Sequence, residues 1–322
     1  MTARSPPPFA GLSVVLVAAF NRRYHRSGLA LAAALQELGC EVRCCEERLR
    51  GLNSLLRRPL AARLDALLGR ARADVVLVFK GTKLAPAEVR ELKGRFGGCW
   101  ANWFPDDPHE IEMSLALGPA YDRLFTTDSS SLERHRRAGA RAYYLAFGCD
   151  PAFLRPPRRL TRCSALVFVG SRDPVRERIV ASLADSGVEL LAFGPGWPTA
   201  SLYGEDFVWA LSRAAVGLNI HRHFSEAGDP TRYGSGANMR VFELACIGTP
   251  QLSDAKGDIA RHFEPGREIV LYRSADELRA LARELLADAA YRQSLAAAAR
   301  DRALREHTWR HRLEELLTVT LR

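Results

Sequence analysis

The sequence predicts an α/β protein made of two domains, each built on a parallel sheet. Short apolar runs of strand length alternate with helical segments along the chain, and strand–helix–strand order implies parallel pairing of the strands. The length of 322 residues suits two cores of about 150 residues each better than one. These two observations define the fold class, and the elements follow in order.

The first half of the chain reads as a series of strands joined by helices. Residues 11–20 form a continuous apolar run, a helical stretch ends at Gly39, and residues 40–45 read as the next strand. Ser130 and Glu133 have the spacing of a capping box, which predicts a helix that starts there. Further strands are expected at residues 73–81, 99–104, 121–128 and 140–148.

The second half repeats the pattern after residues 149–163, a proline- and arginine-rich segment expected to link the domains. Asp173 as N-cap and Pro174 at the first helical position start the first helix of this half. Strands are expected at residues 164–171, 188–197, 214–223, 250–254 and 267–272. A helix is expected at residues 258–263, and the chain ends in helices that break near His307. The expected divisions are residues 1–155, 156–306 and 307–322.

Composition excludes several classes of protein. Apolar residues at 47% and charged residues at 26% are typical of globular proteins. Seven cysteines without a C-x-x-C pair or a His/Cys cluster argue against a disulfide framework or zinc site and favour a reducing cytoplasm, so no metal is expected. The first ten residues lack the apolar core of a secretory signal, and no apolar run has the length of about 18 residues that spans a bilayer.

The net charge of +9 predicts attraction to anions. The arginines are spread through the helices rather than gathered in one block, and no nucleic-acid motif accompanies them. Nucleic acid is therefore not an expected partner. Contact with an anionic membrane at the inner face, or with a phosphorylated substrate, is compatible with this charge.

The stretch Ser235–Asp254 has more features that indicate a binding site than any other part of the sequence, and it reads SGANMRVFELACIGTPQLSD. A polar loop enters a short helix that carries Arg240 and Glu243 on one face and ends at Gly248. Amides at Asn238, Met239 and Arg240, together with the Arg240 side chain, would bind and stabilise an anion such as a diphosphate, and Glu243 would accept hydrogen bonds from sugar hydroxyls. The alternative is a core-packing helix with a surface ion pair.

Two other strand ends add candidate ligands for a phosphate or a sugar. Gly170 and Ser171 follow a strand and precede a helix with Arg176 in its first turn, a second possible phosphate cradle. Asn219 and His221 end another strand. The alternatives are an exposed arginine on a surface helix and a structural histidine. Residues 222–237 read as a loop able to close over a ligand.

The sequence NWFPDDP places Asp106 and Asp107 directly after an apolar strand. A carboxylate on a rigid loop at the carboxyl edge of a sheet is suited to general base catalysis on an acceptor hydroxyl. Asp-Pro and Pro-Asp are also common turn and cap residues, which is the structural alternative.

The run NMRVFELACIGTPQLSD resembles the signature region of the group-1 glycosyltransferases, in particular the branch related to the spore-maturation protein CgeB. The phrases NWFPDDP, FVGS followed by arginine, and EHTWRHRLEELL are similar to elements of the same branch. This resemblance implies the GT-B fold, two Rossmann-like domains facing across a cleft, with the last helix crossing back to the first domain. It also implies that Glu243 binds the nucleotide ribose.

The resemblance further implies a hexosyltransferase that uses a nucleotide-sugar, commonly a UDP-sugar, without metal or other cofactor, and retains the anomeric configuration. Gly236 and Ser235 stand where such enzymes often carry a second acidic residue, which leaves the sugar and the stereochemical course open. The acceptor is also open among glycan, lipid-linked sugar, protein and small metabolite. Two alternatives are a nucleotide-sugar epimerase or hydrolase on the same fold, and a catalytically degenerate binding module.

Overall fold

The protein is described by a computed structural model that covers residues 7–20, 26–47, 59–157, 161, 163–222 and 234–322. The chain divides into two compact units, one of residues 1–146 with 309–322 and one of residues 147–308. The first division lies between Ala146 and Phe147, ahead of the proline-rich segment that the sequence indicated as the linker. Each unit is described by itself below.

In the first unit, the described residues form a six-stranded sheet in the order β2-β1-β3-β4-β5-β6, with every neighbouring pair parallel. Its elements are β1 (Ser13–Ala18), α1 (Ser27–Glu37), β2 (Glu41–Glu46), α3 (Leu60–Leu68), β3 (Val75–Phe79), α4 (Pro86–Phe96), β4 (Cys99–Phe104), α5 (Ile111–Leu117), η1 (Gly118–Ala120), β5 (Arg123–Thr126), η2 (Ser129–Ser131), α6 (Leu132–Arg137), β6 (Ala142–Tyr144) and α12 (Trp309–Thr320).

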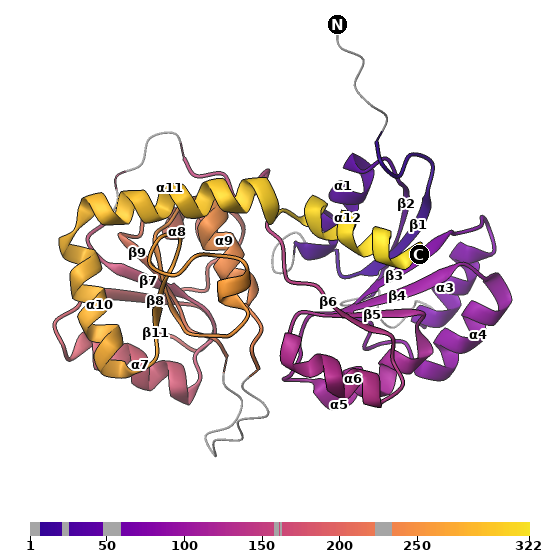
Figure 1. The fold of residues 1–322 in the computed structure, drawn as a ribbon, viewed down its shortest axis with the longest axis horizontal. Helices are drawn as coiled ribbons and strands as arrows, with labels where there is room; N and C mark the ends of the chain where they lie inside the picture. The colour runs from indigo at the N-terminus through magenta and orange to yellow at the C-terminus, as the bar shows by residue number, and fades with distance from the viewer. Residues whose placement is uncertain (1–6, 21–25, 48–58, 158–160, 162, 223–233) are drawn as a thin grey trace, which may run out of the picture. The chain divides into compact units, whose positions relative to one another are not determined.

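Side-chain alternation along β4 shows how the two faces of this sheet are covered. Trp100 and Phe104 point to one face, where they join the core formed with the leucines of α3 and α4. Trp103 points to the other face and packs edge-on against Trp309 of α12, with ring centroids 5.6 Å apart. The last helix of the chain therefore lies on the first sheet, beside α1 (Figure 1).

In the second unit, the described residues form a five-stranded parallel sheet in the order β11-β10-β9-β7-β8. Its elements are β7 (Leu166–Val169), α7 (Pro174–Ala184), β8 (Leu190–Phe193), α8 (Gly204–Arg213), β9 (Val216–Asn219), α9 (Met239–Ile247), β10 (Gln251–Asp254), η4 (Ile259–Arg261), β11 (Val270–Tyr272), α10 (Ala275–Ala287) and α11 (Ala289–Glu306).

Helices cover both faces of this second sheet. Leu183 of α7 and Leu278 of α10 pack with the apolar side chains of β7, β9 and β11 in one core. α8, α9 and α11 lie on the other face, with α9 packed between α8 and α11 (Figure 1). Both sheets are thus buried between helices, as continuous apolar strands require.

Several local sequence signals are confirmed and two are wrong. Asp173 caps α7 by accepting from the Arg176 amide, and Gly248 ends α9 with a left-handed φ of 79°. Ser130 does not cap a helix, because its hydroxyl donates to Asp128 and α6 begins only at Leu132. Residues 258–263, read as an α-helix, contain only the 3₁₀ turn η4.

Candidate functional site

The predicted donor residues meet at one edge of the second sheet. Gly170 and Ser171 follow β7, while Asn219 ends β9 and His221 comes two residues later. β7 and β9 are neighbours, and the chain order runs away from them in opposite directions along the sheet. Ligands of doubly wound sheets bind outside the carboxyl ends of the strands at this type of reversal. The structure therefore brings these four residues together at one edge of the sheet.

The start of α9 is fixed by a chain of side-chain hydrogen bonds. Asn238 is the N-cap, and its side-chain oxygen accepts from the Val241 amide at 3.3 Å. Its side-chain nitrogen donates to Asn219 Oδ1 at 3.0 Å, and Asn219 in turn donates to Ser253 Oγ at 2.9 Å. Met239 is the first residue of the helix. Asn219 and Asn238 thus hold the helix N-terminus against β9 and β10.

His221 continues this network to Asp254 at the end of β10. Its Nε2 accepts the Asn238 amide at 3.1 Å, so the ring proton must lie on Nδ1, which donates to Asp254 Oδ1 at 2.6 Å. The His221 amide donates to the same carboxylate oxygen at 3.0 Å. Burial would raise the pKa of the Asp254 carboxyl, but these contacts hold it below its ordinary value.

Arg176 connects two strand ends rather than standing open to a ligand. Its side chain is buried, Nε and Nη2 donate to the Ile220 carbonyl at 3.2 and 2.8 Å, and Nη1 donates to the carbonyl and hydroxyl of Ser171 at 3.0 and 3.2 Å. Burial lowers the pKa of its guanidinium. The structure therefore shows Arg176 positioning the turn after β7.

Arg240 and Glu243 form an ion pair within α9, through Nη1 and Oε2. The Arg240 guanidinium also donates to the Val169 carbonyl at 3.1 Å and lies 4.3 Å from the centre of the Phe207 ring. Burial lowers the pKa of Arg240 and raises that of Glu243, and each partner opposes the shift of the other. Arg240 thus ties Glu243 to the end of β7.

One carboxylate oxygen of this pair remains available. Among the residues that the structure describes, Arg240 donates the hydrogen bond that the Glu243 carboxylate accepts, and it does so at Oε2. The Glu243 side chain is 17% exposed. The second oxygen, Oε1, is therefore able to accept from a bound hydroxyl. A buried carboxylate held by a guanidinium is a rigid acceptor, because its rotamer is fixed before any ligand binds.

The turns after β7 and β8 approach closely. A Cβ at Gly194 would lie 2.3 Å from the Gly170 carbonyl oxygen, and Gly194 has a φ of 130°. Trp197 donates from its indole to the same oxygen at 2.9 Å. The Gly170–Ser171 turn is thus shaped by a second loop that the sequence analysis did not connect with it. Its signal was the Gly-Pro-Gly-Trp run after β8.

In the first unit, Asp106 and Asp107 have different surroundings. The Asp107 carboxylate is fully buried and accepts from Ser114 Oγ, from Thr126 Oγ1 at 2.7 Å and from His135 Nε2 at 2.8 Å. Asp106 is 41% exposed and forms an ion pair with Lys80. Only Asp106 can reach a substrate, so Asp107 is a structural residue in this arrangement, contrary to the expectation that either carboxylate could act as base.

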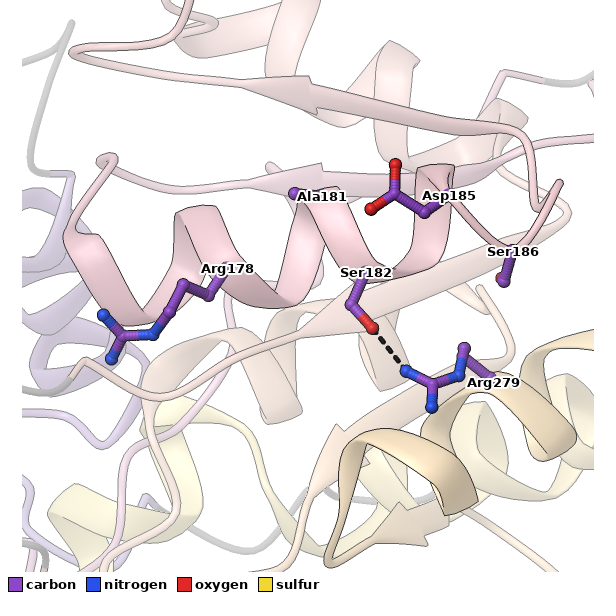
Figure 2. Close-up of a pocket in the computed structure, with 6 residues that line it drawn as sticks. All are labelled: Arg178, Ala181, Ser182, Asp185, Ser186 and Arg279. Atoms are coloured by element: carbon purple, nitrogen blue, oxygen red, sulfur yellow. Dashed lines mark hydrogen bonds between the residues drawn. The ribbon is translucent and has the colours of Figure 1, made fainter.

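A groove of about 470 Å³ lies elsewhere on the second unit, between α7 and α10 (Figure 2). It is lined by Arg178, Ser182, Asp185 and Arg279, and Arg279 donates to the Ser182 hydroxyl. Ser182 and Asp185 lie at the C-terminal end of α7, whereas the predicted donor residues gather at its N-terminal end. This groove contains none of the predicted site residues.

The described residues lack both a metal-ligand cluster and a membrane-spanning helix. No three His, Cys, Asp or Glu side chains in this part of the chain lie close enough together to hold a metal ion. No helix within it combines the length and apolar character needed to cross a membrane. Residues 223–233, most of the loop expected to close over a ligand, lie outside the described residues.

The fold of this protein is similar to that of known glycosyltransferases. Residues 172–318 match the model of a family described as glycosyl transferase-like. Sucrose-phosphate synthase from Thermosynechococcus elongatus superposes with a TM-score of 0.69 over 96% of this chain and 98% of its own, at 13% identity. The chain has the GT-B fold.

Two further GT-B structures are similar over nearly the whole chain. AviGT4, a glycosyltransferase of avilamycin A biosynthesis, has a TM-score of 0.67 at 19% identity, covering 95% of this chain and 96% of its own. Anabaena Alr3699/HepE in complex with UDP and glucose has a TM-score of 0.66 at 12% identity, covering 96% and 100%. No curated protein matches the sequence. These matches agree with the group-1 resemblance and do not distinguish the CgeB-like branch within it.

Proposed function

We propose that this protein is a glycosyltransferase that moves a hexosyl group from a nucleotide-sugar donor to an acceptor hydroxyl. The observation that carries the proposal is Glu243, whose Oε2 is held by Arg240 while Oε1 remains to accept from the ribose of the donor. The match of residues 172–318 to a glycosyltransferase-like family and the UDP-bound Alr3699/HepE complex support a nucleotide donor, with UDP as the nucleotide.

In this proposal the diphosphate lies at the N-terminus of α9 and the Gly170–Ser171 turn. The Met239 and Arg240 amides at this helix end stabilise the negative charge that grows on the departing diphosphate, which requires no metal ion. The Asn238 amide, also expected in the anion site, instead donates to His221 Nε2. Arg176 and Arg240 act mainly by positioning these groups, because the hydrogen bonds described above direct them to Ile220, Ser171, Val169 and Glu243.

Transfer forms a bond between the acceptor oxygen and the anomeric carbon while the bond from that carbon to the diphosphate breaks. The proton of the acceptor hydroxyl goes to Asp106 or to the departing phosphate. The CgeB-like branch and retention of configuration remain part of the proposal. The net charge of +9 supports peripheral contact of the protein with an anionic membrane surface.

A thermal-shift screen of the full chain with UDP, GDP, dTDP, CMP and their sugars tests the donor class. A ligand present at about 100 times its dissociation constant adds roughly 2.7 kcal/mol of stability, which raises the melting temperature. We expect a rise with uridine nucleotides that Glu243→Ala removes and that the control Glu284→Ala, an exposed residue of α10, retains. A wild-type protein that responds to no nucleotide would refute the proposal and favour the degenerate binding module.

Product analysis then separates the remaining activities. A transferase consumes UDP-sugar only slowly in water and faster when an acceptor is added. An epimerase or hydrolase would turn over the donor at its full rate without acceptor. Release of free sugar or an epimeric donor at a rate unaffected by acceptors would therefore replace the transferase proposal.

A further inference from the structure

Lys80 has an unusual backbone conformation, and it lies directly after β3 at the carboxyl ends of the strands of the first sheet. It follows β3 with a φ of 71°, and it is the one non-glycine residue with a positive φ in the described part of the chain. Such a conformation is unfavourable for a residue with a Cβ, so the surrounding structure must impose it. β1 and β3 are the neighbours from which the chain order diverges in this sheet, so Lys80 lies at its ligand-binding edge.

The turn is held in place by β4. The buried side chain of Asn102 donates to the carbonyls of Val78 and Lys80, both at 3.1 Å, and the Lys80 amide donates to the Trp103 carbonyl at 2.9 Å. Gly81 follows with a φ of 80°, and a Cβ there would lie 2.6 Å from a methyl group of Val78. The backbone of Lys80 is therefore fixed from both sides.

This turn brings the Lys80 ammonium to two carboxylates. Nζ contacts Asp106 and lies 2.9 Å from Glu110 Oε1. The Lys80 side chain is only 17% exposed, whereas those of Asp106 and Glu110 are 41% and 38% exposed. Burial by itself would lower the pKa of Lys80, but the two carboxylates raise it, so the ammonium stays charged.

Lys80, Asp106 and Glu110 are here called the Lys80 triad. The two carboxylates are exposed hydrogen-bond acceptors, and both are held in place by the largely buried Lys80 ammonium. Each carboxylate has more lone pairs than its lysine contact uses, and both reach solvent. One positive and two negative charges sum to −1, which repels a phosphate or carboxylate group at this point. Hydroxyl groups, which can donate to both carboxylates, match it.

We propose that the Lys80 triad is the subsite for a neutral, polyhydroxylated group of the acceptor. Asp106 and Glu110 accept hydrogen bonds from neighbouring hydroxyls of that group, and Lys80 is a positioning residue that sets their spacing. The inference rests on the proposed transferase function and selects among its acceptors. An acceptor that places a sugar-like diol here fits, and one that places a phosphate here does not.

Saturation-transfer NMR on the full chain with saturating UDP tests the subsite with two probes, methyl α-D-glucopyranoside and glucose 6-phosphate. We expect the neutral glycoside to bind more tightly to the wild type by about tenfold, the factor that one charged hydrogen bond provides. Lys80→Met should weaken the binding of the glycoside, because the two carboxylates lose the contact that sets their spacing. Lys80→Arg should restore that binding in part, and the exposed neighbour Lys83→Met should leave it unchanged.

The double variant Asp106→Asn with Glu110→Gln gives a second readout that a structural role would not produce. Loss of the negative charge should improve the binding of glucose 6-phosphate relative to the glycoside. Equal binding of both probes to the wild type, no binding of the glycoside, or equal effects of Lys80→Met and Lys83→Met would overturn the inference.

A parallel UDP thermal shift separates the two proposals. The triad belongs to the first unit and Glu243 to the second, so the triad variants should keep the wild-type response to UDP. If the wild type fails to respond to UDP, the donor assignment fails. If it responds while the glycoside result is negative, only the acceptor subsite fails.

Discussion

The His221 ring joins the end of β10 to the start of α9: Nδ1 lies 2.6 Å from Asp254 Oδ1, and Nε2 lies 3.1 Å from the Asn238 amide nitrogen. Because the amide can only donate, the imidazole is held as the Nδ1–H tautomer. The Asp254 carboxylate therefore acts on the start of α9, part of the proposed donor site, through the ring, although Asp254 belongs to β10.

Asp254→Asn should lower the free energy of unfolding at neutral pH by about 1–3 kcal/mol, the cost of a lost charged partner in a buried network. The pKa of Asp254 lies below its ordinary value of 3.8 in the folded protein. Its stabilising effect is therefore complete above about that pH and disappears as the pH falls through the folded-state pKa. Urea unfolding between pH 3 and 7 measures this.

The difference between wild type and Asp254→Asn should shrink below pH 4, while the exposed control Asp185→Asn should give no such convergence. A difference that stays constant across the range would show that the contact contributes no pH-dependent stability. UDP binding should weaken in Asp254→Asn and not in the control, because only the former loosens the start of α9.

The Arg240–Glu243 pair can be examined by a double-mutant cycle. Arg240→Met leaves a largely buried carboxylate without its partner, which should lower the free energy of unfolding by about 2–4 kcal/mol. The double variant Arg240→Met with Glu243→Gln should recover part of this loss, because the uncompensated charge is gone. Additive effects in urea titrations would mean that the two side chains do not interact in solution.

Gly194 and Gly187 form a matched pair for the close approach of two turns. Both have positive φ, so alanine should cost each about 1 kcal/mol in backbone strain. Only at Gly194 does the added Cβ meet another backbone, the Gly170 carbonyl. Gly194→Ala should therefore destabilise the protein further and weaken UDP binding, whereas Gly187→Ala should leave UDP affinity intact. Equal losses in calorimetry and titration would contradict this.

Trp309 should stabilise the first unit although it lies near the end of the chain. It is 4% exposed and packs against Trp103, so Trp309→Ala should cost about 3–5 kcal/mol. The exposed Leu321→Ala is the apolar control and should cost little. Hydrogen exchange resolved by peptide should show the loss in β4 and α1 rather than in the second sheet. Uniform loss across both sheets would instead indicate one cooperative unit.

The sequence by itself determined the two parallel α/β halves and the sheet edge at which the proposed donor residues gather. The apolar strands, the cap at Asp173 and the stop at Gly248 are local signals, because each depends on residues within one helix turn or strand. The carboxyl ends of parallel strands all lie at the same edge of a sheet, so the edge that carries these polar residues could be inferred from the sequence.

Tertiary structure alone decided what each polar side chain does. Asp106 and Asp107 are neighbours in the sequence, yet one pairs with Lys80 at the surface and the other is buried against Thr126 and His135. These partners come from other elements, so no local pattern shows them. The partners of the arginines are also set by packing, because a long side chain with several donors can bond to any carbonyl that lies within its reach. Arg176 donates to the Ile220 carbonyl and Arg240 to the Val169 carbonyl, and both carbonyls lie at the ends of neighbouring strands.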